Sequence, residues 1–262
     1  MLPDSDVLNW IIFPAGNCVK YVADETVNAS ILHKSITNLA NMKPLLLIAQ
    51  QQLLEHKQDD TSLKFLLKEN EFLEKEAKNI INSNFHSINS HGLIGLWCAV
   101  ETAVETAVED TIVLILMNDI NALEAIKNAG YNIKGNIKSP LNEIEARNYY
   151  SRKLEKQTRN DVTVGEGYCI LLSIFGLNIS LDKKTLNVLS EINDVRNCLL
   201  HRGGIIDEKI SNSSIELTKF IGKEINICNN LYLKYYDAVG KFSSALLGAT
   251  ANSSYVKTIK PT

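Results

Sequence analysis

The sequence has little of what secreted or membrane-embedded proteins need. Its five cysteines are widely scattered and form no CxxC pair, which argues against a disulfide framework and against a zinc site. The N-terminal residues lack the basic start and the long apolar run of a signal peptide, and no stretch offers roughly 18 consecutive apolar residues for a membrane span. We therefore expect a cytoplasmic protein without membrane contact, whose cysteines are buried free thiols.

A large excess of charge is also missing. The chain has 27 Lys and Arg against 30 Asp and Glu, a net charge of -3, which excludes a protein that coats nucleic acid through a globally basic surface. A local basic groove remains possible, because residues 127–160 hold eight basic residues and only three acidic ones. Such a run could guide a phosphate backbone, and it is also typical of an exposed helix. The basic residues are Lys127, Lys134, Lys138, Arg147, Arg152, Lys153, Lys156 and Arg159.

Proline is scarce, with 5 in 262 residues, and long segments have apolar residues at helical spacing. These features predict an all-α fold. The polar stretch at 82–92 favours a loop, so we predict an N-terminal helical accessory region over 1–89, a helical domain over 90–250 and a flexible tail over 251–262. The expected helices are 25–41, 44–56, 61–82, 93–117, a short one within 118–130, one opened by Ser139 and Pro140, 164–177, one ending before Gly203, and 227–247.

The helix over 93–117 has the strongest pattern, with one apolar stripe that includes Leu96, Trp97 and Val100. It is expected to lie in the core. Within it, "AVETAVETAVED" places Glu101, Glu105 and Glu109 in a column, where like charges four residues apart repel each other slightly. The column is either a solvated acidic face or faces basic side chains such as Arg196, Arg202 or those of 147–159.

The stretch "SEINDVRNCLLHRGG", residues 190–204, puts polar residues at the end of an amphipathic helix that Ser180 or Asp182 caps and Gly203 and Gly204 terminate. On a regular helix Asn197 and His201 share a face, whereas Arg196 is rotated from His201 by about 140°. Either the last turn loosens, or Arg196 of one chain meets His201 of another across a twofold axis.

An Arg and a His suit the cleavage of a phosphodiester bond. Arg holds a permanent charge and a donor fork that fits phosphate, and His exchanges protons near neutral pH. In RNA the 2′-hydroxyl is an internal nucleophile, so a base, an acid and a stabilising cation suffice. Because no cluster of His or acidic residues has metal-ligand spacing, we expect chemistry without a metal or another cofactor.

The segment "RNCLLH" resembles the R-x4-6-H signature of the HEPN superfamily of α-helical nucleases and nucleic-acid-associated proteins. Glu191 stands five residues before Arg196, as in the E-x3-K-R-x4-H form, although Val195 replaces the Lys. The resemblance covers roughly residues 90–248. It implies a helical-bundle core, a homodimer with the site at its interface, and RNA cleavage to a 2′,3′-cyclic phosphate. Arg196 and His201 would be catalytic, Asn197 would orient the phosphate or the His, and Glu191 would hold Arg196.

The expected function is thus an endoribonuclease of the toxin or antiviral abortive-infection kind, restrained by an antitoxin or another regulatory protein. Further RNA contacts would come from Arg202, Arg147, Arg152, Lys153 and Lys156. One alternative is a HEPN-like module without catalysis that binds RNA, a nucleotide or a protein. Another is a helical scaffold, in which Arg196 only pairs with Glu191 or with an acid of the 101–109 column, and His201 and Arg202 only complement the carbonyls at a helix C-terminus.

Overall fold

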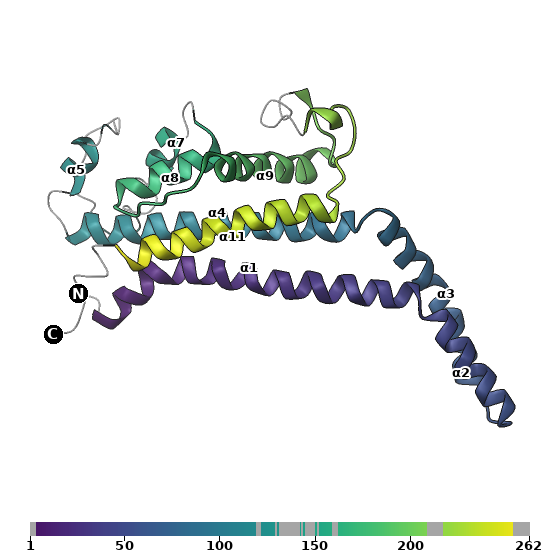
Figure 1. Ribbon diagram of the computed structural model, residues 1–262. Coiled ribbons are helices and arrows are strands. Elements are labelled where there is room, and N and C mark those ends of the chain that lie inside the picture. The colour runs from purple at the N-terminus through teal and green to yellow at the C-terminus, as the bar shows by residue number, and fades with distance from the viewer. Residues whose placement is uncertain are drawn as a thin grey trace. The chain divides into compact units, whose positions relative to one another are not determined.

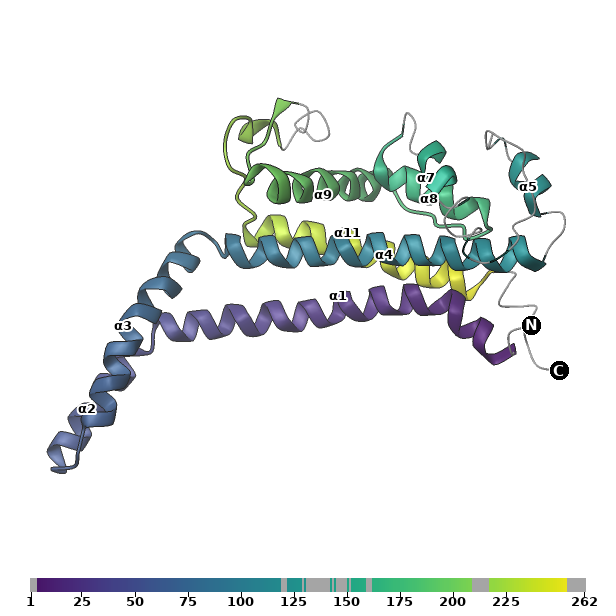
Figure 2. The same ribbon diagram turned by 180° about the vertical axis from the view of Figure 1, so that it is seen from behind.

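The computed structural model describes residues 4–118, 122–128, 130, 142, 144, 150, 152–158, 162–208 and 217–253. These residues are mostly helical (Figures 1 and 2), and the described part of the chain contains no β-strand, only the isolated bridges Ile205–Glu224 and Ile206–Ile221. The expected all-α fold is confirmed. The elements are α1 (Asp4–Ala40), α2 (Lys43–Glu55), α3 (Thr61–Asn82), α4 (His86–Asn118), α5 (Ala122–Asn128), α7 (Arg152–Thr158), α8 (Val164–Ile174), α9 (Lys183–Arg202), η2 (Thr218–Phe220) and α11 (Asn229–Ala251).

Contacts divide the chain into two compact units. Unit 1 takes in the chain up to Ala23, Leu93–Ile225 and the chain from Lys234 onward, and unit 2 comprises Asp24–Gly92 and Asn226–Leu233. The boundary at Gly92 lies close to the one expected after residue 89. The N-terminal part of the chain nevertheless groups with unit 1 rather than with an accessory region, because its helix packs there.

Helix α1 begins far earlier than the expected residue 25. Its first part holds Ala15, Cys18 and Val22, which are buried at helical spacing within unit 1. Pro14 lies inside the helix, where it removes one backbone hydrogen bond and favours a kink. Both views show α1 bending in its N-terminal part (Figures 1 and 2). The apolar contacts stabilise a helix that the proline weakens, which is why sequence pattern alone placed its start too late.

The core of unit 1 forms around α4. Leu96, Trp97 and Val100 are fully buried, as the expected apolar stripe requires. The Trp97 ring stacks on Tyr168 of α8 at 6.1 Å, and Tyr168 in turn meets Phe242 of α11 at 6.2 Å. The three aromatic rings therefore join α4, α8 and α11, and they help to fix the layer against which α9 packs.

Helix α4 begins at His86, within the polar stretch that was expected to be a loop. The turn before it is short, because Asn84 and Phe85 have left-handed backbone angles (φ 54° and 61°). His86 Nδ1 accepts a hydrogen bond from the N–H of Ile227 (2.9 Å), and Asn89 Nδ2 donates to the carbonyl of the same residue (2.9 Å). These long-range partners satisfy polar side chains that otherwise favour a loop.

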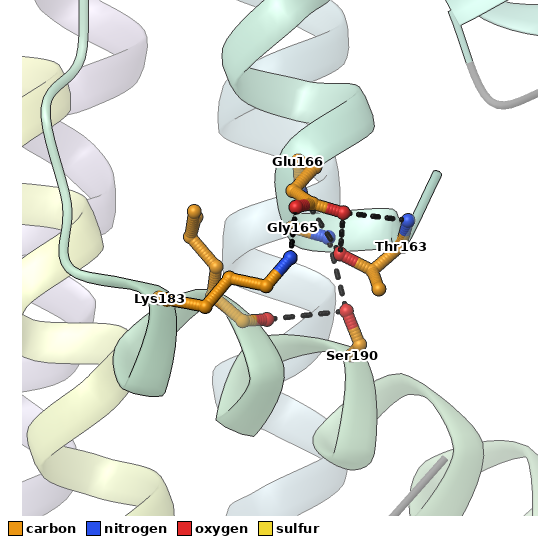
Figure 3. Close-up of polar contacts among 6 residues, drawn as sticks. Thr163, Gly165, Glu166, Lys183 and Ser190 are labelled. Atoms are coloured by element: carbon orange, nitrogen blue, oxygen red, sulfur yellow. Dashed lines mark hydrogen bonds and ion pairs between the residues drawn. The ribbon is translucent and has the colours of Figure 1, made fainter. Parts of the chain in front are cut away.

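The junction between α8 and α9 is polar and tightly packed (Figure 3). Thr163 and Glu166 form a capping box at the start of α8, and Lys183 pairs with the Glu166 carboxylate. The Ser190 hydroxyl accepts a hydrogen bond from the N–H of Gly165 (3.2 Å). Bonds from Lys183 and Thr163 lower the pKa of Glu166 to about 2. These contacts fix α9 against α8.

The remaining expected elements fit to different extents. Helix α5 lies within the expected 118–130, and α11 extends from Asn229 to Ala251 where 227–247 was expected. The start of the helix expected at Ser139 and Pro140 lies outside the described residues, as does most of the expected tail. Of the segment after Ser139, the structure describes α7, which carries three of the basic residues singled out by sequence.

Candidate functional site

Helix α9 positions the Arg196–His201 segment, and both of its ends are capped. Asp182, one of the two residues expected to cap the helix, accepts a hydrogen bond from the N–H of Thr185 (2.8 Å). This bond lowers the pKa of Asp182. At the other end Gly203 takes the left-handed conformation (φ 60°), and the N–H of Gly204 donates to the carbonyl of Cys198 (3.1 Å). The segment thus occupies the last two turns of a well-defined helix.

Arg196 is held in place by two side chains. Its Nη2 donates to Glu101 Oε2 of α4 (3.1 Å), and its Nη1 donates to Asn197 Oδ1 (2.8 Å). The Arg196 and Glu101 side chains are only 20% and 27% exposed, so solvent screens this ion pair only in part. The buried Nε–H of Arg196 has no acceptor among the described residues. The guanidinium is therefore oriented and retains one unsatisfied donor.

His201 lies at the surface in the last turn of α9, and Asn197 is half-buried one turn before it. The His201 side chain makes no hydrogen bond or ion pair with other described residues. Nothing in that part of the chain links it to Arg196, as the rotation of about 140° between these positions on one helix leads us to expect. A single chain therefore presents an oriented cation and an accessible imidazole, but does not join them.

Glu191 does not hold Arg196, which corrects the role implied by the resemblance. Its buried carboxylate accepts bonds from Lys234 Nζ (3.1 Å to each oxygen) and from the Tyr235 hydroxyl (2.7 Å). Glu191 lies five residues before Arg196, so at 100° per residue the two side chains leave the helix about 140° apart. Glu191 therefore ties α9 to α11. No sequence pattern indicated these partners of Glu191, since Lys234 and Tyr235 lie in a helix with no motif.

Glu101 takes the role expected of Glu191. In the sequence, the only indication of this role was that Glu101 belongs to the four-residue repeat on α4. The repeat left open whether its acidic column was solvated or paired with basic side chains. The column faces basic side chains. Glu101 pairs with Arg196, and Glu105 and Glu109 line a small cavity of about 140 Å³ together with Arg152 of α7.

The other basic residues expected to contact RNA are dispersed. Arg202 is exposed and pairs with Asp207 just beyond the helix. Arg152 and Lys156 are exposed and Lys153 is half-buried on α7, while Arg147 lies outside the described residues. The structure thus offers basic side chains at the end of α9 and on α7, without a described contact that joins the two groups.

The cysteines differ in burial. Cys18 and Cys198 are free and buried as expected, and burial raises the pKa of Cys18 to about 11, but Cys98 is exposed.

Among the residues that the structure describes, no group of three or more His, Cys, Asp or Glu side chains could hold a metal ion. Within the same residues, no helix is both long and apolar enough to cross a bilayer.

Comparisons with family models, curated proteins and solved structures found no match to this chain.

Proposed function

We propose that this protein is a metal-independent endoribonuclease of the HEPN type, acting as a homodimer in which two copies of the Arg196–His201 segment meet. The observation that carries the proposal is the fixed guanidinium of Arg196 two turns from the C-terminus of a capped helix, with the accessible ring of His201 on the last turn. The helix and its terminating glycine support this arrangement by fixing where both side chains leave the backbone.

The chemistry follows from the two side chains. His201 can accept the proton of the attacking 2′-hydroxyl as a general base and then give it to the leaving 5′-oxygen as a general acid. Arg196 stabilises the charge that develops on the phosphate through its guanidinium, which Glu101 orients. Asn197 fixes one edge of the guanidinium. The ribose 2′-hydroxyl attacks, the P–O5′ bond breaks, and a 2′,3′-cyclic phosphate remains.

A second copy supplies what one chain lacks. Within one α9 the Arg196 and His201 side chains diverge, and a twofold axis near the helix end would bring the Arg196 of one copy toward the His201 of the other. The toxin or antiviral role, and restraint by an antitoxin or regulatory protein, belong to the same proposal.

One observation favours a second candidate, a HEPN-like module that binds RNA or protein without cleaving it. Glu101 already balances the charge of Arg196, so an incoming phosphate has to compete with a carboxylate for the guanidinium. Such a module would use the segment as a dimerisation or binding element, and it predicts binding without turnover.

Incubation of the purified chain with structured and unstructured RNA in EDTA separates these candidates. We expect cleavage by the wild type, and a loss of about 1,000-fold or more in His201→Ala and Arg196→Ala while the dimer persists. His91→Ala, which removes another exposed histidine, is the control and should cleave normally. Substrates with 2′-deoxyribose at the cut position should resist cleavage. RNA binding without cleavage under all conditions would favour the second candidate.

The pairing of Glu101 with Arg196 gives a finer test. Glu101→Ala removes an anchor of the guanidinium and should lower the cleavage rate about tenfold, with a smaller effect on KM, whereas Glu101→Gln keeps an acceptor oxygen and should restore most of the rate. Glu105→Ala, one turn further along the same column, should leave the rate unchanged. Equal rates in Glu101→Ala and the wild type would remove Glu101 from the site.

A further inference from the structure

Unit 2 contains a cavity of about 500 Å³ where α1 faces the start of α4. Two contacts fix the helices beside it. His33 Nε2 of α1 lies 3.2 Å from Asn89 Oδ1 of α4, and the His33 ring stacks on Phe85 at 4.0 Å. The volume falls within the range of small-molecule binding sites, which is about 300–1,000 Å³. The walls of this cavity are therefore formed within the chain.

Glu25 is the one acidic residue among the described residues that line the cavity, and no Lys or Arg is among them. Glu25 is half-buried, and its Oε1 accepts a hydrogen bond from the Tyr232 hydroxyl (3.0 Å). In the described part of the chain, no basic side chain pairs with this carboxylate. A carboxylate offers about four acceptor sites, so most of its capacity is unused. A half-buried charge without an opposite charge favours the binding of a cation.

The position of the Glu25 carboxylate depends on a glycine of α4. A Cβ on Gly92 would lie 2.4 Å from Glu25 Oε1 and 2.7 Å from the Tyr232 hydroxyl. Only a residue without a side chain therefore leaves room for this hydrogen-bonded pair. Both atoms are the ends of flexible side chains, so a larger residue at 92 would displace them without forcing the helices apart. The carboxylate is thus placed by α1, α4 and α11 together.

The rest of the wall is mainly apolar. Asn28 and Leu32 follow Glu25 by three and seven residues on α1, which puts all three on one face of the helix. Ile31 and Leu32 are 56% and 47% exposed, and Ile88 of α4 lines the same cavity. Seven residues of helix rise by about 10 Å, so the charged end and the apolar end of the cavity lie about that far apart.

Two neutral polar side chains complete the lining. Asn28 and His91 bring a side-chain amide and an imidazole to the cavity. A protonated primary amine has three N–H donors, and a carboxylate, an amide oxygen and a neutral imidazole can each accept one of them. The lining thus provides acceptors for an ammonium group as well as an apolar surface.

These features favour a cation with an apolar body over other ligands. A fatty acid or a phosphate would bring a second negative charge to Glu25, and a purely apolar molecule would leave the carboxylate without a partner. We propose that the cavity binds a small molecule that carries a protonated primary amine on an aliphatic chain, with the ammonium on Glu25 and the chain against Ile31 and Leu32. An alkyl chain of about six carbons, with bonds of about 1.5 Å, spans most of the distance between the two ends.

This inference does not rest on the ribonuclease proposal. The cavity lies in unit 2, whereas the Arg196–His201 segment lies in unit 1. Its test measures the binding of an amine and not the cleavage of RNA, so the two proposals can fail separately.

The test is an NMR titration of the full chain with hexylamine at about pH 8, where an ordinary imidazole is neutral and an alkylamine is protonated. Three compounds serve as ligand controls. Hexan-1-ol has no charge, hexanoate has the opposite charge, and ethylamine lacks most of the chain. We expect saturable binding of hexylamine with a Kd of about 1 mM or tighter, and binding that is weaker by about tenfold or more for each control.

Three variants locate the site. Glu25→Gln keeps an acceptor oxygen for Tyr232 but loses the charge, and it should raise the Kd of hexylamine about tenfold or more. Gly92→Ala displaces the same carboxylate and should also weaken binding. The matched control is Asp24→Asn, which removes an equal charge from an exposed neighbouring position that does not line the cavity. This control should bind hexylamine like the wild type.

Circular dichroism checks that the variants keep their helices, and Glu25→Gln decides alone if Gly92→Ala does not fold. The absence of saturable hexylamine binding, equal binding of hexan-1-ol or hexanoate, an unchanged Kd in Glu25→Gln, or an equal loss in Asp24→Asn overturns the inference.

A lysine of a partner protein would present the same ammonium group, so N-acetyl-lysine methylamide is tested as well. Its backbone amides would meet the apolar end of the cavity, and we expect weaker binding than that of hexylamine. Tighter binding of this compound would assign the cavity to a partner's lysine and overturn the small-molecule proposal. A Glu25→Gln variant that loses the amine and still cleaves RNA would support the inference and leave the ribonuclease proposal intact.

Discussion

Helix α9 and the α2–α3 hairpin are both amphipathic, yet they differ in almost every stabilising feature. Eight residues of α9 are buried, Asp182 caps its start and Gly203 its end. Neither α2 nor α3 has a side-chain cap at its N-terminus, and together they bury two residues. Helix α9 thus receives its stability from packing and caps within the chain, whereas the hairpin leaves large apolar side chains exposed. An amphipathic sequence pattern therefore does not by itself tell whether its apolar side is buried.

The largest expected effect on the free energy of unfolding comes from comparing a leucine-to-alanine substitution in each region. Leu189 of α9 is fully buried, so Leu189→Ala should lower the free energy of unfolding by about 3 kcal/mol. Leu66 is 50% exposed, and Leu66→Ala should change the unfolding free energy of the monomer by no more than about 0.5 kcal/mol. Urea denaturation at low protein concentration gives both values, and similar losses would erase the contrast.

A second prediction concerns how closely α8 approaches α9. A Cβ on Gly165 would lie 2.7 Å from the backbone oxygen of Leu186, so Gly165→Ala forces the helices apart and should cost about 2 kcal/mol. Gly240→Ala in α11 is the control. Nothing lies within 4 Å of a Cβ there, and the change should stabilise the helix by about 0.5–1 kcal/mol. Thermal melts of both variants would show opposite shifts.

A third prediction compares the ion pairs of the two regions. Glu191→Gln removes the buried carboxylate charge that pairs with Lys234, whose side chain is only 26% exposed, and should cost about 2 kcal/mol. Glu71→Gln breaks the exposed Lys43 pair of the hairpin and should cost less than about 1 kcal/mol. Equal costs in urea denaturation would mean that Lys234 reaches solvent when its partner is lost.

The smallest effect is a pH dependence at the start of α8. Because the folded chain lowers the pKa of Glu166 to about 2 from 4.5, the ionised carboxylate adds stability above the unfolded pKa and loses it as the pH falls toward 2. Glu166→Gln should therefore cost about 1 kcal/mol at neutral pH and almost nothing near pH 2. If the stability difference between the wild type and Glu166→Gln were constant across this pH range, the low pKa of Glu166 would be contradicted.

Several elements were readable from sequence because their causes are local. The apolar stripe of α4, the Asp182 cap and the terminating Gly203 all follow from spacing or from one residue's backbone preference. The start of α1 and the start of α4 were not readable. Pro14 and the polar residues around His86 oppose a helix locally, and distant contacts override them.

The same contrast between local causes and long-range contacts applies to the candidate site. Sequence placed Arg196, Asn197 and His201 near the end of one helix and implied that Arg196 and His201 diverge. It left open whether the acidic column with Glu101, 95 residues away, would meet Arg196, and it did not indicate that Glu191 would bind Lys234 and Tyr235. A helical repeat gives the direction of a side chain relative to its own helix, but not the helix that lies opposite.

The order of residues is enough to specify an all-α chain, its best-patterned helices and the residue types at the end of α9, because apolar period, caps and glycines act over a few residues. Which acid meets which base, and which apolar faces are buried, follows only from the folded chain, because those outcomes depend on contacts between segments far apart in the sequence.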